Sequence, residues 1–149
     1  MKQGYATTNF HVKELVHPLF IEQHGEGKMI KVLNNYAPFL LLGIEQLKTF
    51  IGGNSITIND YKWGGNFESS GLRHHAAPVG AGLSAHYFMC ATDCKFKHWN
   101  IADLQQQILE NAASHPYIVR MEDARSTPTW LHIQWGYRLP GKTINVFKP

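Results

Sequence analysis

The chain has 149 residues, of which 44% are hydrophobic and 17% are charged, and its formal net charge is +3. This length supports one hydrophobic core and is too short for two independent domains, so we expect a single domain over residues 1–149. The weak positive charge, without a run of lysines and arginines, argues against nucleic acid as a partner. The nine histidines favour a site that uses imidazole for metal binding or proton transfer.

The apolar segments of the chain are short. Residues 1–11 lack the hydrophobic stretch of a secretory signal peptide. The longest apolar run, residues 39–43, is far too short to cross a bilayer. We therefore expect synthesis in a cytoplasm, without a signal peptide and without membrane insertion.

The predicted elements begin with a short amphipathic turn at residues 8–16, in which polar capping residues precede apolar anchors. Residues 29–50 carry apolar side chains at helical spacing, and the glycine pair at 52 and 53 ends this predicted helix. Residues 55–59 alternate and are β-branched, which predicts a strand. Residues 64–83 are rich in Gly, Ala, Ser and His without a sustained period. They predict a long irregular loop, which often carries function in a compact domain.

The C-terminal half supplies most of the predicted sheet. We expect strands at residues 90–96, 117–122 and 130–135, the last two as a hairpin, and a helix at residues 102–113. A final extended piece, residues 143–147, can pair at the sheet edge. This order of elements indicates an α+β domain with a small antiparallel sheet and flanking helices.

Two histidines and an aspartate form a candidate metal set. His86 is expected in the mouth of a loop, Asp93 lies seven residues later within a predicted strand, and His132 lies on another strand. Three protein ligands leave the fourth position of a zinc ion free for water, as in catalytic rather than structural sites. Zinc then lowers the pKa of that water and polarises a carbonyl, as amide hydrolysis at neutral pH requires. On spacing alone, the alternative of ordinary surface or core residues stays open.

Three separated boxes of the sequence resemble one family pattern. They are Ser70-Gly71-Leu72-Arg73, then Ser84-x-His86-x-x-Met89-x-Ala91-x-Asp93, then Trp130-Leu131-His132. In order and spacing they are similar to the S-G-x-R, S-x-H-x-x-G-x-A-x-D and W-x-H boxes of the M15 zinc peptidases. That family includes D-alanyl-D-alanine carboxypeptidases and dipeptidases and the L-alanyl-D-glutamate endopeptidases of bacteriophage endolysins. The resemblance covers nearly the whole chain and implies the fold of the D-alanyl-D-alanine and Hedgehog-type zinc peptidases.

The resemblance implies a role for each matching residue. Zn²⁺ would be held by His86, Asp93 and His132. Arg73 would contact the substrate, since a guanidinium can donate to the oxyanion of the scissile carbonyl or to a peptide carboxylate. Ser84 would support the loop of His86 by hydrogen bonding, and Trp130 would lie beside the substrate.

The sequence departs from the family pattern at two positions. Met89 stands where the pattern has glycine, so we expect the loop to differ locally. Thr129 stands three residues before the last histidine, where the family commonly has a Glu or Asp as general base. Threonine cannot take the proton of the attacking water.

Glu122, or Asp123 beside it, is the nearest substitute for the missing base, because it lies on the strand expected to pair with that of His132. The alternative is that Glu122 is a surface residue paired with Arg120 or Arg125. Three further histidines could donate to the transition state instead, with simple solvent exposure as their alternative: His74, His75 and His98.

Two functions are compatible with these residues. The first is a zinc metallopeptidase that hydrolyses an amide bond in peptidoglycan stem peptides, for lysis or remodelling in the manner of a phage endolysin. Glu122 would be its base and Arg73 its electrophilic stabiliser. The alternative is a non-catalytic, zinc-stabilised structural or cell-wall-binding module of a virion, with virion proteins as partners. As an enzyme it would be made in the host cytoplasm and would act on the bacterial cell wall.

Overall fold

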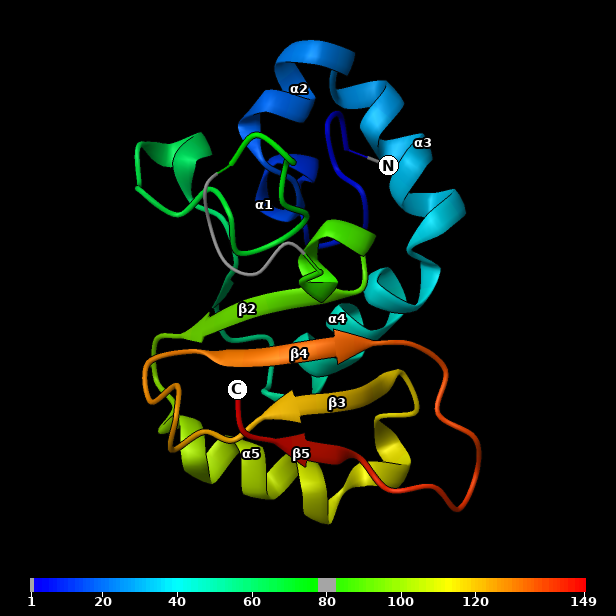
Figure 1. Cartoon of the computed structure of the whole chain (residues 1–149), viewed down its shortest axis with the longest axis vertical. Helices are drawn as coiled ribbons and strands as arrows, with labels where there is room; N and C mark the ends of the chain where they lie inside the picture. The colour runs from blue at the N-terminus through cyan, green and yellow to red at the C-terminus, as the bar shows by residue number, and fades with distance from the viewer. Residues whose placement is uncertain (1, 78–82) are drawn as a thin grey trace.

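The computed structural model describes residues 2–77 and 83–149. In these residues the elements follow in the order α1 (Val12–Leu15), α2 (Pro18–His24), α3 (Glu26–Tyr36), α4 (Pro38–Phe50), β1 (Ile56–Thr57), η1 (Tyr61–Trp63), η2 (Ala85–Phe88), β2 (Ala91–Phe96), α5 (Ile101–Glu110), η3 (Ala112–Ser114), β3 (Ile118–Glu122), β4 (Leu131–Trp135) and β5 (Asn145–Phe147), where η marks a 3₁₀ turn. The expected α+β class with flanking helices is confirmed (Figure 1).

The strands of the described residues form one sheet in the order β1-β2-β4-β3-β5. The pairs β1–β2, β2–β4 and β3–β4 are antiparallel, as expected, and β3 and β4 form the predicted hairpin. The prediction of a wholly antiparallel sheet is wrong, because β5 pairs with β3 in parallel. After β4 the chain returns through an irregular segment along the molecule's edge before entering β5, so β5 runs in the direction of β3 (Figure 1).

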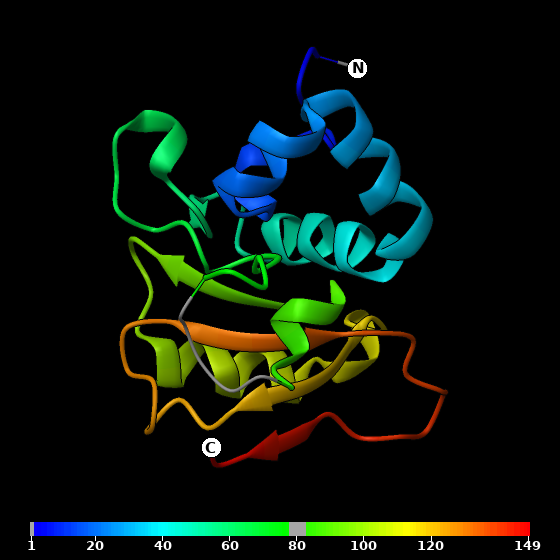
Figure 2. The same ribbon diagram turned by 45° about the horizontal axis from the view of Figure 1, so that its top comes forward.

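The two faces of the sheet have different surroundings. Helices α4 and α5 lie behind the sheet and the turn η2 lies in front of it (Figures 1 and 2). Because side chains alternate along a strand, residues 92, 133 and 121 point to one face and residues 93, 132 and 122 to the other. The first set is Thr92, Ile133 and Met121, all fully buried in the core. The second set is therefore free to form a site on the front.

The predicted helix over residues 29–50 is two helices. Ala37 lies between them in a non-helical conformation, and Pro38 is the first residue of α4. A proline disfavours the α conformation in the residue before it and has no N–H to donate, which explains the break. The sequence did not predict α2, and the predicted strand over residues 55–59 is only the two-residue β1.

Other boundaries agree closely with the prediction. The helix expected at 102–113 is α5, with Asn100 accepting a hydrogen bond from the backbone N–H of Asp103 as its N-cap, followed by the turn η3. The irregular segment expected at 64–83 contains no helix or strand in its described part, and residues 78–82 lie outside the described residues. None of the helices in residues 2–77 and 83–149 has both the length and the apolar character that crossing a bilayer needs.

Gly71 fixes the loop of the first sequence box against the N-terminal segment. The N–H of Leu72 donates to the carbonyl of Leu15 over 2.7 Å, and the N–H of His17 donates to the carbonyl of Leu72 over 2.9 Å. A Cβ atom on Gly71 would collide with the Leu15 carbonyl oxygen, so only glycine allows this close backbone approach.

We expect Gly71→Ala to lower the free energy of unfolding by about 2–3 kcal/mol, since the clash is with backbone that cannot move aside. Chemical denaturation monitored by circular dichroism measures this change. Gly27→Ala in α3 is the matched control, because a Cβ there meets nothing within 4 Å and alanine raises helix propensity by up to about 1 kcal/mol. Equal stability of the two variants would contradict the proposed packing of the Gly71 loop.

Candidate metal centre

The predicted ligands meet on the front of the sheet. Asp93 on β2 and His132 on β4 are directly paired across the ladder. His86 reaches the same point from the 3₁₀ turn η2, whose first residue follows the N-cap Ser84. The side chains of His86 and His132 are buried and that of Asp93 is partly exposed, so the group lies at the base of a surface depression. The structure thus brings together all three predicted ligands.

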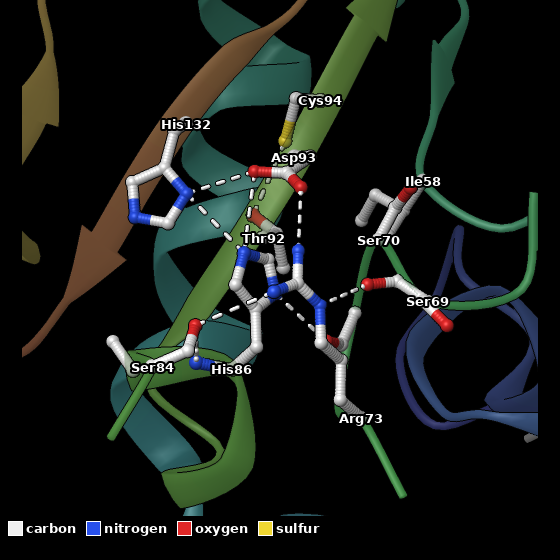
Figure 3. Close-up of polar contacts among 12 residues, drawn as sticks. Ile58, Ser69, Ser70, Arg73, Ser84, His86, Thr92, Asp93, Cys94 and His132 are labelled. Atoms are coloured by element: carbon white, nitrogen blue, oxygen red, sulfur yellow. Dashed lines mark hydrogen bonds and ion pairs between the residues drawn. The ribbon is translucent and has the colours of Figure 1, made fainter. Parts of the chain in front are cut away.

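The three donor atoms form a small triangle (Figure 3). His86 Nε2 lies 3.2 Å from His132 Nδ1 and 3.2 Å from Asp93 Oδ1, and His132 Nδ1 lies 2.8 Å from Asp93 Oδ1. Ligands at about 2.0–2.2 Å from a tetrahedral zinc ion are roughly 3.3–3.6 Å apart. The triangle is therefore close to one face of such a tetrahedron, and this group could hold a metal ion.

A hydrogen bond from the other side sets the tautomer of His86. Its Nδ1 lies 2.9 Å from the carbonyl oxygen of Gly71, which can only accept, so Nδ1 carries the proton. The lone pair of Nε2 then points at the other two donor atoms. A carbonyl that orients a ligating histidine in this way is typical of metal sites.

The two oxygens of the Asp93 carboxylate contact different partners. Oδ1 faces the imidazoles of His132 and His86, and Oδ2 accepts from Arg73 Nη2 over 3.2 Å. Burial raises the pKa of Asp93, but the hydrogen bonds and charges of His132 and His86 outweigh burial and hold this pKa well below the ordinary range. The carboxyl group thus stays ionised at neutral pH, as a metal ligand must.

Arg73 is held in place by three acceptors. Its Nε donates to the carbonyl of Ser69 over 2.7 Å, and Nη1 donates to Ser84 Oγ over 3.4 Å, in addition to the ion pair with Asp93. Ser84 Oγ also accepts from the backbone N–H of His86, so it supports the histidine loop as the sequence predicted. Arg73 borders the open pocket described next, and its contact with a substrate stays a prediction.

A pocket of about 440 Å³ opens above the triangle. The predicted site residues all line it: Arg73, Ser84, His86, Asp93, Glu122, Trp130 and His132. Its remaining walls include Leu83, from the end of the long loop, and Gln134 and Phe147, from β4 and β5. The volume falls within the range of ligand-binding clefts.

Glu122 borders this pocket from the strand next to His132. Met121 pairs with Ile133, so one step further along the antiparallel ladder Glu122 comes opposite His132. Burial raises the pKa of Glu122; the charge of His132 lowers it and that of Asp93 raises it. Thr129, in contrast, is exposed in the turn before β4. A carboxylate is therefore present at the site, although not at position 129.

The alternative pairing of Glu122 with a nearby arginine is not found in the described residues. Arg125 pairs with Asp123, and the guanidinium of Arg120 lies over the Phe147 ring at 4.3 Å. Asp123 is thus engaged away from the pocket, which leaves Glu122 as the carboxylate that faces the triangle.

The other three histidines weighed from sequence do not line the pocket. His74 is buried, and its Nε2 lies 3.1 Å from Gln23 Oε1. His75 packs against the His74 ring with 4.2 Å between centroids, and His98 is exposed.

Gln134 and Phe147 also line the pocket and were not among the predicted site residues. Gln134 follows His132 by two positions, so strand alternation would have placed it on the same face. Phe147 lies edge-on to His132, with ring centroids 6.0 Å apart. It reaches the site only through the parallel pairing of β5 with β3, for which the sequence carried no signal.

Met89 adopts the backbone conformation that favours glycine. Its φ of 57° and ψ of 25° are left-handed, a region that costs an ordinary residue roughly 1–2 kcal/mol. The partly buried side chain packs against the core and offsets this cost. The chain thus keeps a glycine-type turn at this position, where we expected a local change.

No family model, curated protein or solved structure matches the chain significantly. The chemistry of the site is therefore inferred from the residues and their geometry.

Met89→Val should destabilise the protein by about 1–2 kcal/mol, because a β-branched residue is poorly accommodated in the left-handed region. Met89→Gly should stay within about 1 kcal/mol of the parent, since strain relief offsets the lost packing. Denaturant titration of the two variants measures the difference, and a valine variant as stable as the glycine variant would argue against a left-handed turn.

His132→Ala and His86→Ala should each abolish stoichiometric metal binding, because two remaining ligands hold a divalent ion far more weakly than three. Calorimetric titration of the metal-free protein with Zn²⁺ measures the loss. His98→Ala, which removes an exposed histidine, should bind like the parent. If the triangle variants also retain full affinity, the metal is bound elsewhere.

Proposed function

We propose that the chain is a zinc metallopeptidase that hydrolyses an amide bond in peptidoglycan stem peptides. The observation that carries the proposal is the triangle of His86, Asp93 and His132 in the same open pocket as Glu122. A metal-binding group beside a carboxylate with a raised pKa is the minimum that metal-assisted hydrolysis requires.

Zinc is the ion that this ligand set favours. Two imidazole nitrogens and one carboxylate oxygen suit zinc, whereas calcium and magnesium prefer all-oxygen ligands. A zinc ion bound there would polarise the scissile carbonyl and make a water molecule acidic enough to attack it. The buried hydrogen bond from His86 to Gly71 would orient this ligand before any substrate arrives.

Glu122 is proposed as the proton carrier. Its carboxylate lines the same pocket as the triangle, so it can accept a proton from the attacking water. The same group can then return the proton to the departing amine. Its place across the ladder from His132 brings it to the rim of the pocket where the scissile bond would lie.

The remaining pocket residues are proposed to bind the peptide. Arg73 keeps the Asp93 carboxylate oriented, and its place in the pocket wall allows a further contact with the substrate carbonyl or a carboxylate. Trp130 and Phe147 offer apolar walls, and Gln134 offers an amide that can pair with a peptide group. The specific substrate, peptidoglycan in the manner of a phage endolysin, is suggested by the resemblance of the three sequence boxes.

The presence of Glu122 in the pocket supports the first of the two functions considered. A purely structural or wall-binding module would need the ligands but no base. A partly buried carboxylate in the pocket of the triangle supports an enzyme, and no observation in the described residues specifically favours the non-catalytic alternative.

The test combines metal analysis with digestion. Purified protein is assayed for zinc content and incubated with peptidoglycan, with and without a chelator, and released fragments are identified by mass spectrometry. One zinc per chain and chelator-sensitive release of stem-peptide fragments would support the proposal. Bound zinc without cleavage would favour the non-catalytic structural or wall-binding module over the peptidase. Absence of zinc would refute the proposed metal centre.

Glu122→Gln should lower kcat by about 10²–10⁴-fold while the protein keeps one zinc per chain, because the amide retains the shape but cannot accept the proton. The rate of release of stem-peptide fragments measures this, with metal content as the check. Glu110→Gln, on the exposed part of α5, is the matched control and should be fully active. Full activity of the Glu122 variant would exclude it as base.

A further inference from the structure

A buried imidazole joins the loop of the first sequence box to α2. His74 directly follows Arg73 and is 2% exposed. Its ring stands edge-on to that of Phe20 with 4.8 Å between centroids, and its Nε2 lies 3.1 Å from Gln23 Oε1. Phe20 and Gln23 both belong to α2. The His74 side chain therefore packs residues 68–77, which we call the box loop, against this helix.

Both ring nitrogens of His74 have defined partners. The backbone N–H of Ala76 donates to Nδ1 over 3.1 Å. Since an N–H group can only donate, Nδ1 must carry a lone pair, and the proton of the neutral ring lies on Nε2. From there it is donated to the side-chain oxygen of Gln23. This set of contacts is open only to the neutral imidazole.

Protonation of His74 would remove the acceptor. An imidazolium has a donor on each nitrogen, so its Nδ1–H would point at the Ala76 N–H, and neither group would have a partner. A buried polar group left in this state costs about 1–3 kcal/mol. The Ala76 bond lies within a turn that is also held by the N–H of Ala77, which donates to the His74 carbonyl over 2.9 Å. The charged ring can regain partners in water only if it leaves α2 and this turn opens.

The charges around His74 also oppose its protonation. His75 packs against its ring with centroids 4.2 Å apart, and the His17 ring lies 6.2 Å away. Burial, and then the charges of His75, His17 and His24, lower the pKa of His74. The Glu68 carboxylate lies 3.6 Å from His17 Nε2, and no carboxylate of the described residues forms an ion pair with His74. The remaining ionisable groups of the surrounding elements are Glu22, Tyr61, Arg73 and Tyr87.

The box loop supports the candidate metal centre. The carbonyl of Gly71 accepts from His86 Nδ1 over 2.9 Å, and the backbone N–H of Arg73 donates to the His86 carbonyl over 3.2 Å. The Arg73 guanidinium is also the ion-pair partner of Asp93. A change in the position of this loop therefore reaches two of the three candidate ligands.

We propose that the contact between His74 and α2 is a pH-sensitive switch in the fold. At neutral pH the neutral ring holds the box loop against α2. In acid the ring takes up a proton on Nδ1, and the box loop separates from α2 around residues 74–77. Release of the loop withdraws support from His86 and Asp93, so the metal centre is assembled at neutral pH and loosened in acid. This inference requires neither bound zinc nor peptidase activity.

The direction of the pH effect follows from proton linkage. A released ring has the ordinary histidine pKa of about 6.5, and the pKa of the held His74 ring is lower. Between these two values the released state binds more protons than the held state. The free energy that holds the loop is therefore greatest above this interval, falls as the pH decreases through it, and is constant below it.

Hydrogen exchange of the full chain, followed by mass spectrometry at about pH 7.5 and about pH 5.5, tests the switch. A chelator is present in every sample so that metal does not contribute, and the rates are corrected for the intrinsic effect of pH. In acid we expect peptides covering residues 68–77 to lose about tenfold in protection, which corresponds to one unit of pKa difference. Peptides of α5 should keep their protection.

His74→Asn is the decisive variant. The asparagine oxygen can accept from the backbone N–H two residues later, as in an Asx-turn, but the amide does not titrate. The box loop of this variant should have the same protection at both pH values. His98→Ala, which removes an exposed histidine, is the control and should show the acid loss of the parent.

Equal protection of the parent's box loop at both pH values would overturn the proposal, as would an acid loss in His74→Asn equal to that of the parent. A loss of the same size in α5 would mean acid unfolding of the whole domain and would also refute it. If the variant does not fold, ¹⁵N chemical shifts of the His74 ring in the parent decide. A proton on Nδ1 at neutral pH would contradict the switch, and a proton on Nε2 alone, joined by one on Nδ1 as the loop is released, would support it.

Discussion

The arrangement of the candidate metal site depends on the contacts of the Asp93 carboxylate. One oxygen faces both imidazoles and the other accepts from Arg73. The backbone of the same residue ties it down further, since its N–H donates to the carbonyl of Ser70 over 2.7 Å and its carbonyl accepts from Lys95. Strand β2, strand β4 and the loop of the first sequence box therefore converge on one side chain. The guanidinium of Arg73 balances this negative charge in its partly buried place, and removal of the carboxylate would leave the guanidinium without its ion-pair partner.

Sheet register then decides which chemistry faces the solvent. Asp93, His132 and Glu122 follow one another across three neighbouring strands, and the residues adjacent to them in sequence form the core row of Thr92, Ile133 and Met121. A slip of one residue in any of these strands would exchange a site residue for a core residue. The apolar row thus fixes the position of the polar row, so the stability of the core and the geometry of the metal centre are linked. The helices behind the sheet are consequently part of what holds the triangle together, although they contribute no ligand.

The sequence predicted the local features of this arrangement better than the long-range ones. The spacing of His86 and Asp93 across a loop and a strand, and the hairpin that carries His132, were readable because they depend on alternation and turn composition. The break before Pro38 was also readable, because it follows from the chemistry of proline, and it was overlooked. The parallel pairing of β5, and with it the contact of Phe147 with His132, depends on the path of the chain after β4 and has no local signature.

Thr129 brings no carboxylate to the pocket, and Glu122 supplies one from β3. That position lies in an exposed turn, whereas Glu122 ends a strand that pairs with β4 as far as Met121 and with β5 through Glu122 itself. Met121 is the last β3 residue paired with β4, opposite Ile133, and the antiparallel direction brings the next residue, Glu122, toward His132. A carboxylate at position 129 would come from the turn before β4, and that of Glu122 comes from the end of β3, the neighbouring strand. A base carried by a paired strand is held more rigidly than one carried by a turn, and the backbone of Glu122 is held further by Gln105, which donates to its carbonyl from α5 over 2.7 Å. Rigid elements position reacting groups more accurately than loops do, so this arrangement is compatible with the proton transfer proposed for Glu122.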